Sequence, residues 1–142
     1  MIGFGNPGRR DDGLGPAAVE RLSARSIPGV VCESDYQLGI EDALACARHD
    51  IVVFIDAARD LPTPFTFTEV RAAGAIPPMT HALTPEAVLA IAAELYDRRP
   101  DARLLAIRGH IWDIGEGLTA KAEKNLALAL EFLEGFLKEP AP

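Results

Sequence analysis

The stretch that decides the fold is Ile51-Val52-Val53-Phe54-Ile55-Asp56, an unbroken apolar run that ends in a carboxylate. An apolar side chain at every position predicts a strand that is buried on both faces, as in a parallel sheet covered by helices. In open α/β sheets, ligands gather beyond the carboxyl ends of the strands. Asp56 is therefore expected at the edge of the sheet where a binding site forms.

Outward from this strand, the chain alternates between predicted strands and predicted helices. Further strands are predicted at 2–4, 30–33, 65–71 (an edge strand) and 104–107. Helices are predicted after the first strand with Pro16 in the first turn, over 40–47, from Pro85 with Thr84 as N-cap, and after Thr119. The third helix should bury Val88, Ile91, Ala92 and Leu95, and the fourth Leu126, Leu130, Leu133 and Leu137. This order predicts one domain over 1–142, a three-layer α/β sandwich with a mostly parallel twisted sheet.

Composition narrows the classes of function. The chain has 142 residues, 49% of them hydrophobic, which suits one globular domain with a buried core. Its net charge of −7 argues against a broad nucleic-acid surface. No apolar run reaches the roughly 18–20 residues of a membrane span, and no signal peptide is expected. Cys32 and Cys46 are expected to be buried and reduced, with one disulfide as the alternative, which favours a cytoplasmic protein. A monomer is the default expectation.

A glycine-rich turn after the first strand carries two adjacent carboxylates. Residues 5–15 read Gly-Asn-Pro-Gly-Arg-Arg-Asp-Asp-Gly-Leu-Gly, so Asp11 and Asp12 stand just ahead of a predicted helix. Glycines allow the tight backbone turns that bring side chains over the end of a strand. The structural alternative is that either acid caps the helix, a contribution of about 1 kcal/mol.

Asp56 and His81 complete a candidate metal site with Asp12. Asp56 could instead cap the turn that follows its strand, and His81 could be a hydrogen-bonded loop residue. Taken together, two carboxylates and an imidazole suit a divalent transition metal that keeps open positions. His110, which follows a strand end at Gly109, is the reserve ligand. Because no Gly-x-Ser-x-Gly elbow is present and neither cysteine has a neighbouring histidine, a serine or cysteine nucleophile is poorly supported.

Four segments of the chain resemble the hydrogenase maturation proteases. The stretch from Gly5-Asn6 to Asp11-Asp12-Gly13-x-Gly15 is similar to the N-terminal signature of that family. Residues 35–38, 51–56 and 80–83 resemble its second strand end, its third strand with a terminal acid and its histidine loop. Residues 108–110 and 115–119 are similar to the closing motif of one branch. The family's residues before the first strand are missing here, so a short first strand is expected.

This resemblance implies an activity, a metal and a partner. The family has a phosphorylase/hydrolase-like fold and removes a C-terminal extension from the large-subunit precursor of nickel-iron hydrogenase. Its metal-binding trio falls on Asp12, Asp56 and His81, which are also the implied catalytic residues. Nickel would be presented by the substrate, and zinc or cadmium could replace it in vitro. The implied substrate-binding residues are Asn6, Asp11, Asp35 and Gln37, and Asp11 could also orient the site or assist proton transfer.

Two other readings compete with this one. Residues 3–8, Gly-Phe-Gly-Asn-Pro-Gly, also resemble the opening of the peptidyl-tRNA hydrolases, but a histidine is then required where this chain has Arg10-Asp11-Asp12. The same glycines spell G-x-G-x-x-G, the fingerprint of a nucleotide-binding module, with Glu33 or Asp35 as the ribose ligand. That fingerprint should open a helix directly, whereas Pro7 and the insertion after it delay the helix.

Overall fold

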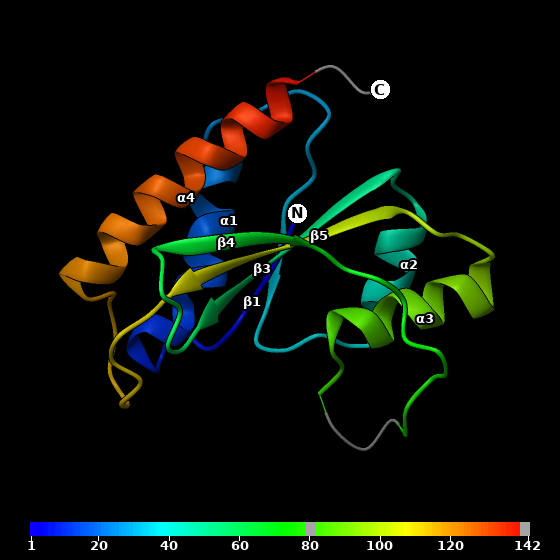
Figure 1. Ribbon diagram of the computed structural model, residues 1–142, viewed down its shortest axis with the longest axis horizontal. Coiled ribbons are helices and arrows are strands. Elements are labelled where there is room, and N and C mark those ends of the chain that lie inside the picture. The colour runs from blue at the N-terminus through cyan, green and yellow to red at the C-terminus, as the bar shows by residue number, and fades with distance from the viewer. Residues whose placement is uncertain (79–81, 140–142) are drawn as a thin grey trace.

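The computed structural model describes residues 1–78 and 82–139 and has a five-stranded sheet between two layers of helices (Figure 1). The strands are β1 (Ile2–Phe4), β2 (Glu33–Asp35), β3 (Ile51–Ala58), β4 (Phe65–Glu69) and β5 (Asp101–Arg108). The α-helices are α1 (Leu14–Ala24), α2 (Glu41–Ala47), α3 (Pro85–Tyr96) and α4 (Ala120–Lys138), and a 3₁₀ turn over Arg10–Gly13 leads into α1.

The strand order explains where a site can form. The order across the sheet is β2-β1-β3-β5-β4, with every neighbouring pair parallel except β4, which runs antiparallel to β5 at the edge. The carboxyl ends of the four parallel strands therefore share one edge of the sheet. The predicted three-layer, mostly parallel sandwich is confirmed.

Two apolar clusters fill the two sides of the sheet. Val53 and Ile55 of β3 pack under α1 and α4, whereas Val52 and Phe54 pack under α2 and α3. Figure 1 shows this division, with α1 and α4 on one face and α2 and α3 on the other. Because both faces are covered, four consecutive residues of β3 are buried, as its apolar pattern predicts.

Local differences from the predicted elements have simple causes. Strand β2 begins at Glu33 rather than at residue 30, because β1 begins at Ile2, whose partner is Glu33. Strands β3 and β5 run longer than their apolar runs because they pair along eight residues. Leu95 was expected inside but is 57% exposed, since the buried part of α3 ends at Ala92.

The helix caps follow the sequence closely. Thr84 accepts a hydrogen bond from the Ala87 N–H (3.2 Å) at the start of α3, and Thr119 does the same for Ala122 at the start of α4. Cys46 is buried, Cys32 is half-buried rather than buried, and both thiols are free. Over the described residues, no helix combines the length and apolar character that crossing a bilayer requires.

Candidate active site

Close approach of α1 to the sheet builds the candidate site. A Cβ atom on Gly15 would lie 2.5 Å from the carbonyl oxygens of both Phe4 and Ile55. One on Gly3 would lie 2.2 Å from the Gly15 carbonyl oxygen. Only glycine fits at these points. The start of α1 is thereby pressed against the carboxyl ends of β1 and β3, next to Asp56.

Asp12 is held over the end of β1 by the backbone of the same turn. The Asn6 N–H donates to Asp12 Oδ2 at 2.8 Å. Gly5 has a φ of +143°, and a Cβ atom there would lie 2.0 Å from the Asp12 carbonyl oxygen. Gly5 thus permits both the turn and the contact that place Asp12.

Asp56 occupies the corresponding position on β3. Its Oδ1 accepts the Ala57 N–H at 2.8 Å. Burial, together with a smaller effect of the Asp12 charge, raises the pKa of Asp56 to about 7, although the Ala57 hydrogen bond opposes the rise. Because the charge of Asp12 acts on this pKa, the two carboxyl groups lie near each other at the carboxyl edge of the sheet.

No cation balances this pair within the described part of the chain. Neither Asp12 nor Asp56 forms an ion pair with any residue of 1–78 or 82–139. Two adjacent carboxylates in a partly buried site are unfavourable unless one holds a proton or a cation lies between them. The pair therefore has the chemistry of a proton-binding or cation-binding site.

The predicted third ligand, His81, lies outside the described residues, so its place is not tested. The described chain resumes at Ala82, where Leu83 forms a bridge with Leu38, just beyond the end of β2. The Leu83 N–H donates to the Leu38 carbonyl at 3.4 Å. The segment that follows His81 therefore returns to the carboxyl edge of the sheet.

Asp11 has a structural place that the sequence did not reveal. Its side chain is fully buried, with an exposed fraction of 0%. Its oxygens accept the N–H groups of His110, Ile111 and Thr119 and the Thr119 hydroxyl, at 2.8–3.1 Å. Burial alone would raise the pKa of Asp11, but these bonds outweigh it and lower the pKa. Asp11 therefore anchors a loop, and its full burial does not favour the expected substrate contact and proton transfer, which stay predictions.

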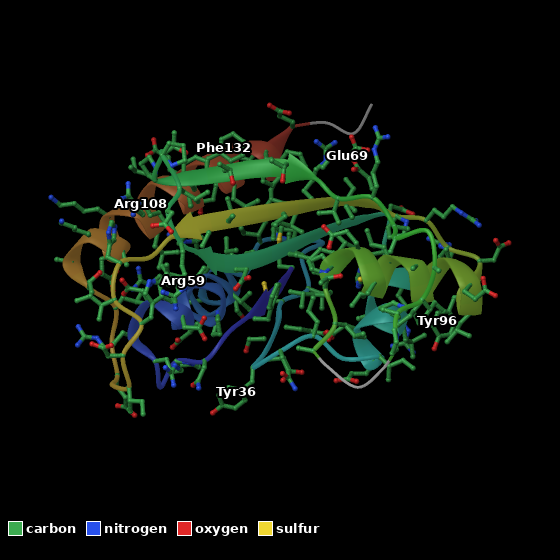
Figure 2. All side chains as sticks on the ribbon, turned by 60° about the horizontal axis from the view of Figure 1, so that its bottom comes forward. Tyr36, Arg59, Glu69, Tyr96, Arg108 and Phe132 are labelled. Atoms are coloured by element: carbon green, nitrogen blue, oxygen red, sulfur yellow. The ribbon has the colours of Figure 1, made fainter. Side chains whose placement is uncertain are left out.

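The anchored loop covers residues 109–119 and packs against the glycine-rich turn that carries Asp12. A Cβ atom on Gly109 would lie 2.9 Å from the Asp11 Cβ and 2.8 Å from the Trp112 ring. The Arg59 guanidinium lies over that ring, 4.2 Å from its centroid. The Arg10 N–H donates to Gly115 at 2.9 Å and fastens the loop to the glycine-rich turn. Figure 2 shows Arg59 and Arg108 at the same end of the sheet.

The predicted substrate-binding residues flank the acid pair. Asn6 is half-buried, and its Oδ1 accepts the Gly8 N–H at 2.9 Å within the turn. Asp35 and Gln37 are exposed at and beyond the end of β2. Tyr36, between them, points outward in Figure 2. These positions suit a peptide-binding rim, although nothing tests contact with a substrate.

A second acidic cluster lies beside β2. Asp35, Glu41 and Asp42 bring ligand atoms within 4.8 Å of one another, and no other three-residue group among the described residues does so. Asp42 caps its own turn by accepting the Gly39 N–H at 2.8 Å. This hydrogen bond explains why the Asp42 carboxyl group is buried, and no bound ion is needed to explain it.

His110 does not join the acid pair. Its Nε2 lies 3.3 Å from Asn125 Nδ2 of α4, and the same amide donates to the Arg108 carbonyl at 2.9 Å. The imidazole therefore contacts α4, and its expected role as reserve ligand is not supported.

The glycine fingerprint does not form a phosphate cradle. The spaces over Gly3 and Gly5 are filled by the carbonyl oxygens of Gly15 and Asp12. A 3₁₀ turn, rather than an α-helix, follows the fingerprint. These glycines allow α1 to pack closely against the sheet. The G-x-G-x-x-G pattern therefore gives no support to a nucleotide-binding module.

Several solved structures that share this fold are named hydrogenase maturation proteases or endopeptidases. The maturation protease HycI from Thermococcus kodakarensis KOD1 has a TM-score of 0.74 and 22% identity, over 97% of this chain and 90% of that one. The hydrogenase maturating endopeptidase HybD from E. coli has a TM-score of 0.73 and 25% identity, over 96% of this chain and 90% of that one. An endopeptidase from Escherichia coli has a TM-score of 0.70 and 26% identity, over 96% of this chain and 90% of that one. No family model and no curated protein matches the chain.

These comparisons confirm the expected resemblance. Similarity at 22% identity shows a common fold, and the two proteins at 25% and 26% are named endopeptidases, which supports a protease. The shared fold also agrees with the sheet order and layers described above.

Proposed function

We propose that this chain is a metal-dependent endopeptidase that removes the C-terminal extension of a nickel-loaded [NiFe]-hydrogenase large-subunit precursor. The observation that carries the proposal is the acid pair of Asp12 and Asp56 at the carboxyl edge of the sheet, with no cation beside it in the described residues. We place the enzyme in the cytoplasm, as a monomer.

The donor set fits a divalent metal. Two carboxylates that lie near each other bind such a cation favourably, because the cation relieves their repulsion. Asp12 and Asp56, with His81 as the third donor, would hold the nickel that the precursor presents, and its Lewis acidity would polarise the scissile carbonyl or a water. Zinc or cadmium would bind the same donors in vitro.

The chain's own residues prepare the site for this substrate. The Asn6 N–H fixes Asp12 and the Ala57 N–H fixes Asp56, so both carboxyl groups are oriented before the substrate arrives. Asp56 has a pKa of about 7, so near neutral pH it carries a proton part of the time. Asp56 therefore releases a proton when the metal binds.

The rim of the site suits a protein substrate. Large apolar side chains are exposed on the loops that follow β2 and β5, namely Tyr36 (69%), Ile40 (53%), Ile111 (41%) and Ile114 (85%). Apolar side chains gathered at one edge are typical of a surface that receives a protein or peptide. A large-subunit precursor fits this rim better than a small molecule does.

Cleavage of purified nickel-loaded precursor tests the proposal. We expect Asp12→Asn, Asp56→Asn and His81→Ala each to lower turnover at least about a hundredfold, because each removes a metal ligand. Asp50→Asn is the matched control, since Asp50 precedes the same strand at its opposite end and is exposed. Nickel-free precursor should remain uncut. Full turnover by Asp56→Asn would refute the mechanism, and full turnover by His81→Ala would remove His81 from it.

A further inference from the structure

A basic pocket lies at the same edge of the sheet as the acid pair. It is a cavity of about 220 Å³ between the end of β5, the loop before β4 and the start of α4. Its lining includes Arg108, His110, Lys121, Lys124 and Asn125. The chain as a whole has a net charge of −7, so this gathering of cations runs against the overall charge.

Among the residues that the structure describes, the cations of the pocket have no ion-pair partners. Within residues 1–78 and 82–139, Arg108, Lys121 and Lys124 form no ion pair. Glu123, the acid between the two lysines, is paired with Arg21 of α1 at 2.8 Å. The positive charge of the pocket is therefore uncompensated by the described part of the molecule.

The position of the lysines on α4 is also unfavourable for the helix. Lys121 and Lys124 account for two of the three lysines of the chain and stand in the first two turns of α4. The positive end of the helix dipole disfavours cations there and attracts anions. Lys121, Lys124 and Asn125 are spaced i, i+3 and i+4, so they share one face of the helix. Helix dipole, lysines and arginine together favour an anion.

Asn125 and His110 give the pocket a fixed polar wall. The Asn125 amide donates to the Arg108 carbonyl and contacts His110 Nε2 at 3.3 Å. The backbone of His110 is held in turn by the buried Asp11 carboxylate. The wall is thus connected to the loop that borders the acid pair.

The backbone at the pocket lies close to the backbone of Asp56. Arg108 pairs with Ala58, two residues beyond Asp56 on the neighbouring strand. With a rise of about 3.3 Å per residue and a strand spacing of about 4.8 Å, the Cα atoms of Asp56 and Arg108 lie roughly 8 Å apart. An extended peptide covers this distance with two or three residues.

From these observations we propose that the basic pocket is a subsite that binds a carboxylate of the peptide substrate, a few residues from the bond that is cut. This inference rests on the proposed endopeptidase function. The carboxylate is either the terminus of the peptide or an acidic side chain within it, because both present the same planar anion to arginine and lysine.

Titration of the ¹⁵N-labelled full chain with short peptides tests the subsite. Three N-acetylated alanine–glycine tetrapeptides serve as probes: one with a free C-terminal carboxylate, one amidated, and one amidated with an internal glutamate. We expect saturable shifts of the His110, Lys121 and Asn125 amide signals with at least one carboxylate peptide and none with the neutral amide. The responding peptide identifies the source of the carboxylate.

Variants separate the pocket from general electrostatics. K121Q/K124Q keeps the aliphatic part of both side chains and should lower the affinity for the responding peptide at least about tenfold. Lys138→Gln, the remaining lysine at the far end of α4, is the matched control and should leave binding unchanged. The absence of saturable shifts with any carboxylate peptide, equal binding by K121Q/K124Q, or saturation by inorganic phosphate alone overturns the subsite.

Precursor cleavage distinguishes this subsite from the enzyme function itself. K121Q/K124Q should raise KM with kcat unchanged, because the pocket contributes to binding and lies apart from the acids. Cleavage with an unchanged KM overturns the subsite and leaves the endopeptidase standing. If the wild-type chain does not cut the precursor at all, the endopeptidase function fails. The peptide titration still tests the subsite in that case, because it needs neither nickel nor turnover.

Discussion

The raised pKa of Asp56 predicts that this carboxyl group destabilises the folded protein as pH rises. In the unfolded chain Asp56 loses its proton near the ordinary value of 3.8, whereas in the folded protein it does so at about 7. Between these values the folded state holds one proton more than the unfolded state, so its stability falls as pH increases. Asp56→Asn is neutral at every pH and keeps an oxygen that can accept the Ala57 N–H.

The size of the effect follows from the two pKa values. With one pKa unit equal to about 1.36 kcal/mol, the cost of ionising Asp56 increases by up to about 2.6 kcal/mol between pH 5 and pH 8. Partial exposure of the side chain makes this an upper bound, and we expect about 1–2.6 kcal/mol. The asparagine variant should therefore gain that much stability relative to the wild type over the same interval.

Urea denaturation in the presence of a chelator, at several pH values between 5 and 8, measures this difference. Other titrating groups are common to the two proteins and cancel when their unfolding free energies are subtracted. Asp50→Asn, at the exposed opposite end of β3, should give a difference that does not vary with pH. A flat difference for Asp56→Asn would refute the reasoning about burial and about the neighbouring charge of Asp12.

Three further outcomes test the packing and the metal. Asp11→Asn should lower the free energy of unfolding by about 2–4 kcal/mol, because a buried charge that accepts four hydrogen bonds is lost; a denaturation midpoint within error of wild type contradicts this. Gly15→Ala should destabilise by at least about 2 kcal/mol through its clash with the Ile55 carbonyl, whereas Gly135→Ala, with open space around it on α4, should gain up to about 1 kcal/mol in the same thermal melts. Zn²⁺ should raise the melting temperature more at pH 8 than at pH 5.5, because Asp56 must release its proton first; equal shifts argue against Asp56 as a ligand.

Local sequence signals predicted the elements well. The apolar run of β3, the Thr84 cap of α3 and the Thr119 cap of α4 each report a local preference that the structure confirms. Apolar periodicity gave a wrong prediction of burial at Leu95, which is exposed although it lies on the apolar face of α3. Burial there depends on which element packs against the helix, and periodicity does not report this. The start of β2 was also missed, because it depends on its partner β1.

The candidate site was predicted in part. The position of Asp56 near the carboxyl end of β3 followed from the apolar run before it, and its proximity to Asp12 followed from the rule that strand ends share an edge. The roles of Asp11 and Asp12 could not be separated, because adjacent acids in one turn give the same pattern. The lysines at the start of α4 were a visible signal for the basic pocket, since cations are unfavourable at that end of a helix.

The sequence by itself determined the order and type of the elements, because hydrophobic periodicity, caps and glycines act over a few neighbouring residues. Only the tertiary structure decided that Asp11 is buried while Asp12 lies near Asp56, that His110 contacts Asn125, and that Arg108 lines one pocket with the lysines of α4. These contacts join residues that are distant in the chain. They depend on β1 lying between β2 and β3 and on the close contact of Gly15 with Ile55, which no local pattern specifies.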